Sequence, residues 1–185
     1  MGKKGTTGYR IGDQNALHFI TLTTVGWVDI FTRKIYKDLL VSSLDFAVKN
    51  KGLEIYAYCI MSNHIHLIVR ASEGFNLSDI LRDFKKFTSR QIINLIKTNN
   101  ESRREWMLNL FQYAGHNNPN NKVFQVWRHD NHPVELYGSD VIDQKLDYIH
   151  KNPVVAGIVE NEEDYFYSSA RNFLGLTSVL QIEEL

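Results

Sequence analysis

The chain has 185 residues, of which 43% are hydrophobic and 23% are charged, and its 21 basic side chains are balanced by 21 acidic ones. This length allows one domain with a hydrophobic core and is short for two, while the composition excludes a disordered or fibrous chain. Zero net charge excludes a uniformly basic surface, so any contact with nucleic acid would need a local cluster of positive charge. We expect a single domain over residues 1–185, with a folded core at about residues 17–173 and flexible termini.

Cysteine content and hydropathy indicate the cellular compartment. The only cysteine, Cys59, cannot form an internal disulfide, and its place in the apolar stretch 55–61 favours a small core residue. The polar, basic start of the chain is not followed by an apolar stretch, and no segment has the roughly 18 apolar residues of a membrane span. The sequence therefore predicts a cytoplasmic protein without a membrane segment.

The first part of the chain predicts three strands and one helix. Alternating bulky and polar side chains, or many β-branched and aromatic ones, favour strands at residues 17–25, 53–61 and 64–70. Between the first two strands, Thr32 offers an N-cap for a helix that ends at Gly52. Ser62 and Asn63 supply a tight turn between the last two strands.

The middle of the chain predicts two helices and a further strand. Asn76 caps a long helix with Asp79 as its capping-box partner, and the apolar side of this helix continues to about Lys97. The elements expected after it are a helix at residues 101–110, an asparagine-rich loop at 116–122 and a strand at 123–127.

A last helix begins at Ser139 or Asp140 and runs to about His150, and the Asn152-Pro153 step ends or bends it. The order of the elements is strand, helix, strand, strand, helix, then a later strand and helix. This order fits an α+β fold of the ferredoxin-like (RRM-like) plan, an antiparallel sheet with helices on one face and the other face open.

Two histidines on the third strand form the sharpest local motif. Residues two apart on a strand point to the same side, so His64 and His66 project together while Ile65, Leu67 and Val69 face the core. Such a pair also arises by chance in a chain with seven histidines. The apolar residues on the opposite side of the strand favour the interpretation as half of a metal site, which needs a third ligand from elsewhere.

The last helix carries two residues that could complete such a site. Tyr148 and Asn152 are four apart, so they share one helical face. An amide oxygen can bind a hard metal, and a tyrosine beside that metal can act as a nucleophile. The alternative is a half-buried packing role for Tyr148 and a helix-end cap at Asn152, and the spacing alone does not separate the two.

A basic stripe on the long helix is the candidate nucleic-acid contact. The stripe contains Arg82, Lys85, Lys86 and Arg90, and only one acidic residue lies within the same stretch. Trp127 and Arg128 add an aromatic and a basic group, a combination that is typical of single-strand binders. The alternatives are a solvated helix surface for the stripe and a core position for Trp127.

These segments together resemble the single-tyrosine HUH transposases, in particular the REP-associated tyrosine transposases of the IS200-like transposase family. The resemblance extends from about residue 17 to residue 173 in the order of the family. It is carried by the motifs MSNHIHLI at 61–68, LRDFKKFT at 81–88, LDYIHKNPV at 146–154 and YSSA at 167–170.

The resemblance implies a ferredoxin-like fold with the tyrosine helix across the open sheet face. It implies that His64, His66 and Asn152 bind Mg²⁺ or Mn²⁺ and that Tyr148 is the nucleophile of a DNA-nicking and strand-transfer reaction through a 5′-phosphotyrosine. The partner would be single-stranded DNA, as a hairpin or palindrome, at the nucleoid of a bacterial cell. Family members tend to be basic, and this neutral chain departs from that pattern.

Two other functions stay open at this point. A non-catalytic RRM-like module could stack bases on Tyr56 and Tyr58 of the second strand, although this leaves the histidine pair unexplained. A replication initiator or relaxase usually has another order of histidines and tyrosine, or two tyrosines. A monomer and a homodimer paired through an edge strand are both compatible with the sequence.

Overall fold

The computed structural model describes residues 11–117 and 123–185. The flexible N-terminus expected up to residue 10, and residues 118–122 of the predicted loop, lie outside the described residues. The regular elements are β1 (His18–Thr23), η1 (Val25–Trp27), η2 (Ile30–Thr32), α1 (Lys34–Lys51), β2 (Leu53–Ile60), β3 (His64–Ala71), α2 (Leu77–Thr98), α3 (Arg104–His116), β4 (Val134–Glu135), α4 (Ser139–Val155), η3 (Glu162–Asp164) and α5 (Ala170–Phe173).

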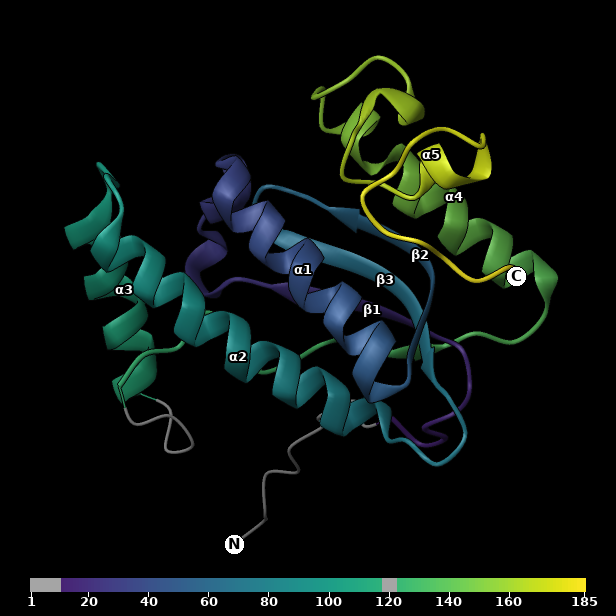
Figure 1. The fold of residues 1–185 in the computed structure, drawn as a ribbon, viewed down its shortest axis with the longest axis horizontal. Helices are drawn as coiled ribbons and strands as arrows, with labels where there is room; N and C mark the ends of the chain where they lie inside the picture. The colour runs from purple at the N-terminus through teal and green to yellow at the C-terminus, as the bar shows by residue number, and fades with distance from the viewer. Residues whose placement is uncertain (1–10, 118–122) are drawn as a thin grey trace, which may run out of the picture.

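The four strands form one antiparallel sheet in the order β2-β3-β1-β4, which is the ferredoxin-like order. Helices α1 and α2 pack side by side in front of the sheet in Figure 1, whereas α4 contacts β2 and β3 from the other side. The predicted fold class is confirmed, including a late helix across the face that α1 and α2 leave open. None of the described helices has the length and apolarity needed to cross a membrane.

Local sequence signals set several element ends. Helix α1 ends at Gly52, whose φ of 66° is left-handed and whose Cα lies so close to Phe75 that a Cβ would meet the ring at 2.4 Å. Asn76 caps α2 by accepting a hydrogen bond from the Asp79 N–H, as predicted. The predicted N-cap Thr32 is wrong: its hydroxyl donates to the Asp29 carbonyl within η2, and α1 begins one residue later.

The strand predicted at 123–127 is also wrong. Within it only Trp127 makes a bridge, to Thr24, and the fourth strand is β4, which pairs with β1 at His18 and Phe19. The stretch still bonds to β1 through single backbone contacts, since the Arg128 N–H donates to the Thr23 carbonyl and the Thr21 N–H donates to the Asn131 carbonyl. The Lys85 ammonium on α2 also donates to the carbonyl oxygens of Arg128 and His129, which ties the same stretch to α2.

The last predicted helices are longer than expected. Helix α3 extends to His116, and α4 continues through Pro153 to Val155 instead of ending near His150. Proline removes one N–H and crowds the preceding turn, yet the Ala156 N–H still donates to the Asn152 carbonyl. Residues 174–185, expected to be flexible, pack along β2, with Leu180 buried and the Glu183 N–H donating to Ile55.

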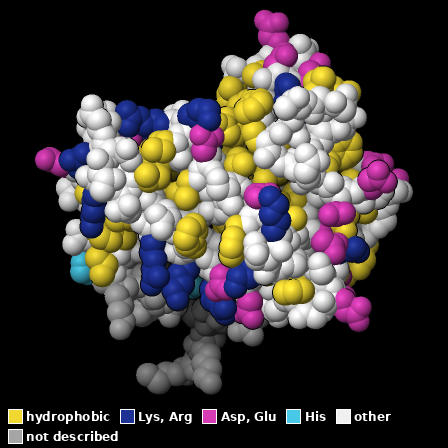
Figure 2. Space-filling view, in the orientation of Figure 1, with side chains coloured by type: hydrophobic (Ala, Val, Ile, Leu, Met, Phe, Trp, Pro, Cys, Tyr) yellow, Lys and Arg dark blue, Asp and Glu magenta, His cyan; other side chains and the backbone are white. Residues whose placement is uncertain are grey.

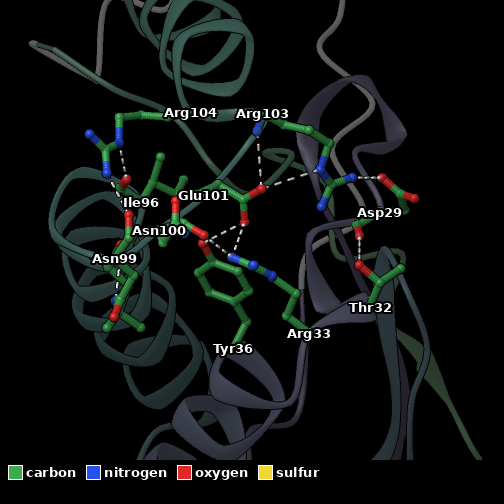
Figure 3. A network of polar contacts seen from close by, with 11 residues as sticks. Asp29, Thr32, Arg33, Tyr36, Ile96, Asn99, Asn100, Glu101, Arg103 and Arg104 are labelled. Atoms are coloured by element: carbon green, nitrogen blue, oxygen red, sulfur yellow. Dashed lines mark hydrogen bonds and ion pairs between the residues drawn. The ribbon is translucent and has the colours of Figure 1, made fainter.

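A buried carboxylate joins α1 to the connection between α2 and α3 (Figure 3). The Glu101 side chain is 1% exposed and accepts from the Tyr36 hydroxyl and the Arg33 guanidinium, both at 3.2 Å, and from the Arg103 N–H. Burial alone would raise the pKa of Glu101, but these donors and the Arg103 charge lower it overall. The carboxylate therefore stabilises the fold in its charged form.

Replacing Glu101 with Gln should lower the free energy of unfolding by about 1–3 kcal/mol at pH 7, because three donors lose a charged acceptor. Since the pKa of Glu101 is lowered on folding, its contribution is present above the pKa of the unfolded carboxyl and is lost as the pH falls through the folded value. Urea unfolding of both proteins across this acidic range measures the difference, which should shrink with falling pH. The exposed Glu105 on α3 provides the matched control, Glu105→Gln, and an equal loss in both variants would contradict the prediction.

Candidate functional site

Four side chains from β3 and α4 converge on the sheet face that α4 covers. The ring centroids of His64 and His66 are 4.6 Å apart, and the Tyr148 ring lies 5.1 Å from that of His66. The Asn152 amide nitrogen is 3.4 Å from Nε2 of His66. Alternation along β3 and the four-residue spacing along α4 thus deliver the two predicted pairs of residues to one place.

Hydrogen bonds orient both imidazoles. Nδ1 of His64 lies 2.6 Å from the Asn63 amide oxygen, and the Asn63 amide nitrogen donates to the Trp27 carbonyl, which fixes the orientation of that amide. An amide oxygen only accepts, so His64 donates from Nδ1 and keeps the lone pair on Nε2. Nδ1 of His66 bonds at 2.9 Å to the hydroxyl of Thr21, its cross-strand partner on β1.

Both histidines are held neutral at neutral pH. Burial, followed by the charges of His64 and Lys145, lowers the pKa of His66 to about 3. Burial also lowers the pKa of His64, against a smaller opposing effect of its hydrogen bond with Asn152. Neutral imidazoles with a lone pair on Nε2 are the form in which histidine binds metals.

The donor set fits a divalent metal ion. Rotating the Asn152 amide by 180° would exchange its nitrogen and oxygen, so this side chain can offer an oxygen toward the imidazoles. Two imidazoles and an amide carry no charge and leave a bound ion its full positive charge. Among the described residues there is no group of three histidine, cysteine or acidic side chains that could hold a metal, so the His64–His66–Asn152 set is the best candidate.

Tyr148 is half exposed beside this set, and a lysine that was not predicted from the sequence lies next to it. The Tyr148 ring packs edge-on against Phe19, which itself stacks on His66. The Lys145 ammonium lies 4.9 Å from the centre of the Phe19 ring and 6.0 Å from that of Tyr148. The sequence contains a signal for this position: Lys145 and Tyr148 are three residues apart on one predicted helix, so they lie on the same side of it.

A buried hydrogen-bond network fixes α4 to the sheet. Nε2 of His150 is 2.8 Å from the Ser169 hydroxyl, which also bonds to the backbone N–H and carbonyl of Tyr58 on β2. His150 is two residues after Tyr148 and points into the interior. Its hydrogen bond to Ser169 therefore fixes how α4 is rotated about its own axis. The Tyr148 side chain is thereby turned toward His66.

The predicted DNA-binding residues all line one groove of about 1020 Å³ between α2 and the segment 123–131. Figure 2 shows several basic side chains along the α2 side of the molecule, with some acidic ones among them, and further acidic side chains on the side of the C-terminal elements. The neutral total is therefore compatible with a locally basic surface. The predicted residues that the groove brings together are Arg82, Lys85, Lys86, Arg90, Trp127 and Arg128.

Two of these residues are structural as well as groove-lining. The Lys85 ammonium donates to the Arg128 carbonyl and to the Asn131 amide oxygen, and burial lowers its pKa to about 8. Trp127 is 3% exposed, stacks on Phe31 and donates to the Thr88 hydroxyl. Its ring therefore belongs to the core and offers no open face to a base, whereas Lys86 and Arg90 are exposed.

Comparisons with known proteins identify the family and the fold. A family model described as IS200-like transposase matches residues 14–114, which include both histidines and the basic stripe. The structure of a REP-associated tyrosine transposase bound to a REP hairpin superposes with a TM-score of 0.66 at 17% identity, covering 97% of this chain and 93% of that one.

A structure of a proposed transposase from Deinococcus radiodurans R1 has a TM-score of 0.44 and 15% identity, covering 82% of this chain and 97% of that one. No curated protein matches the chain significantly. The family match covers more than half of the chain, from β1 through most of α3. The chain belongs to the IS200-like transposase family.

Proposed function

We propose that the chain, as a single domain, is a metal-dependent single-strand DNA endonuclease and strand transferase with Tyr148 as its nucleophile. The observation that carries this proposal is the exposed Tyr148 ring 5.1 Å from the centre of the His66 ring, beside a second neutral imidazole and an amide. A Mg²⁺ or Mn²⁺ ion held by His64, His66 and Asn152 would polarise the scissile phosphate.

In the proposed reaction, the Tyr148 oxygen attacks the phosphorus of a phosphodiester. The Oη–P bond forms, the P–O3′ bond breaks, and the 3′-oxygen leaves with a proton as a free hydroxyl while the phenol loses its proton. The product is a 5′-phosphotyrosyl link on one strand end. Attack by another 3′-hydroxyl reverses these steps and joins strands, so neither cutting nor joining needs a nucleotide cofactor.

The proposed substrate is single-stranded DNA presented by a hairpin or palindrome. The solved relative is bound to a REP hairpin, and the groove along α2 supplies the positive charge that a phosphate backbone requires. We propose Lys86, Arg90 and Arg128 as the phosphate contacts. Arg82 already pairs with Asp79 and Asp83 at the surface, so its net contribution should be smaller.

The non-catalytic RRM-like alternative is disfavoured by burial. Tyr56 and Tyr58, the side chains that would stack bases, are only 6% and 0% exposed. Stacking needs an accessible ring face, and the Ser169 N–H donates to the Tyr58 carbonyl at this strand. The observations therefore favour an enzyme over a module that binds through this strand.

The test is incubation of the chain with single-stranded oligonucleotides from the flanks of its own gene, labelled on the 3′ side, in the presence of Mn²⁺. The expected product is a labelled protein adduct that survives denaturation, together with an unlabelled fragment that ends in a 3′-hydroxyl. Chelation should prevent both products. If oligonucleotides are cut but no adduct forms with any of them, the nucleophile is water and not a tyrosine.

Replacing Lys145 with Met should slow adduct formation about ten- to a hundredfold, because its charge favours the phosphate and the developing phenolate. The initial rate at saturating DNA measures this effect. Lys151→Met is the matched control: Lys151 is on the same helix, is exposed and pairs with Asp147. Equal rates of adduct formation for the two variants would show that Lys145 does not contribute to the reaction.

A further inference from the structure

An exposed tryptophan lies at the edge of the candidate site and has no part in the chemistry described above. Trp27, in the η1 turn after β1, is 58% exposed, and its ring centroid is 6.5 Å from that of His64 in an edge-on arrangement. The aromatic rings thus follow one another from Tyr148 to His66, to His64 and to Trp27. The two histidine rings therefore connect Trp27 to the proposed nucleophile.

The backbone of Trp27 is held in an unusual conformation. Its φ is 55°, directly after Gly26 at 63°, and left-handed conformations are uncommon for bulky residues. The surroundings impose this shape: the Trp27 N–H donates to the Thr24 carbonyl, and the Trp27 carbonyl accepts from the Asn63 amide. Backbone strain persists only where the surrounding structure holds it, and it clusters at active sites and ligand-binding sites.

A cation covers part of the Trp27 ring. The Arg128 guanidinium carbon lies 5.8 Å from the ring centre, at the end of the basic groove that lies along α2. The aromatic and basic pair expected at Trp127 and Arg128 is thus formed by Arg128 with Trp27, because Trp127 is buried. Trp27 thus lies between Arg128 of the basic groove and the histidine pair.

We propose that Trp27 is a stacking platform for an unpaired nucleobase of the strand that enters the site, with Arg128 beside it to contact the adjoining phosphate. An exposed indole stacks on any base, and a guanidinium adds a cation–π contact and a phosphate contact. This inference rests on the proposed function for its substrate. Its test measures binding alone and does not depend on Tyr148 chemistry.

The experiment uses the full chain in the presence of chelator, so that binding is measured without cleavage. The probes are a fluorescent 15-nucleotide oligothymidylate and a matched strand of the same length made of abasic nucleotides. Trp27→Asn should weaken binding to oligothymidylate about tenfold, as expected for one lost stacking contact, and leave binding to the abasic strand within twofold. Trp27→Phe should keep most of the affinity.

The stability of the variants separates stacking from a structural role. Asparagine tolerates the left-handed conformation better than tryptophan, so Trp27→Asn should keep or raise the melting temperature while it lowers affinity. The matched control is Phe46→Leu, which alters an exposed aromatic of α1 on the opposite sheet face and should leave both affinities unchanged. If Trp27→Asn lost affinity equally for both strands, or for neither, the proposal that Trp27 is a stacking platform would be overturned.

A fluorescence measurement covers the case in which Trp27→Asn does not fold. In a Trp106→Phe variant, Trp27 is the exposed tryptophan that remains, since Trp127 is buried. Stacking of a thymine on Trp27 should quench its emission on addition of oligothymidylate, and the abasic strand should not. Unchanged emission at saturating oligothymidylate would overturn the proposal.

Discussion

Tyr148→Phe is expected to abolish the covalent protein–DNA adduct, with a loss of at least about 10³-fold, because the variant lacks the phenol oxygen that we propose as the nucleophile. The side chain is half exposed, and its ring contacts Phe19 and His66 through its edge. Phenylalanine preserves these contacts, so the melting temperature should stay near that of the unaltered protein. Denaturing electrophoresis of labelled DNA measures the adduct.

A neighbouring tyrosine supplies the control for this prediction. Tyr137 is 70% exposed just before α4, and Tyr137→Phe removes a hydroxyl of the same kind outside the site. Adduct formation by Tyr137→Phe should be unaffected. The proposed nucleophile would be wrong if Tyr148→Phe still gave the adduct at a comparable rate.

His66→Gln should slow adduct formation by about 10²–10³-fold, since it removes the imidazole at the centre of the candidate metal site. Glutamine keeps a polar side chain of moderate size in a position that is only 4% exposed. In the unaltered protein the stacking of Phe19 and the Thr21 hydroxyl hold this imidazole in place. Single-turnover rates at saturating Mn²⁺ measure the loss.

Thermal unfolding gives a second readout of the same variant that is independent of catalysis. An ion that binds the folded chain raises its melting temperature, so Mn²⁺ should stabilise the unaltered protein and stabilise His66→Gln much less. His116→Gln, at the exposed end of α3, is the control and should respond to Mn²⁺ like the unaltered protein. If Mn²⁺ stabilised His66→Gln to the full extent, the metal would lie elsewhere.

Several features of this protein were determined by short stretches of sequence alone. Alternation along β3 decided that His64 and His66 share a side, because side-chain direction in a strand has a period of two. Gly52 and Asn76 marked the end of α1 and the start of α2, since their effects act on backbone groups within a turn. The helical spacing of Tyr148 and Asn152 followed in the same way. The order of these elements was enough for the ferredoxin-like fold class.

Other features were decided by contacts between distant segments, which no local pattern contains. Lys85 on α2 binds the carbonyl oxygens of Arg128 and His129, and Trp127 fills the core beside Phe31. Trp27, without any sequence signal of its own, is brought next to His64. Periodicity fixes which side of an element a residue faces, but the partner on that side depends on how elements far apart in the chain pack, and only the tertiary structure determines that.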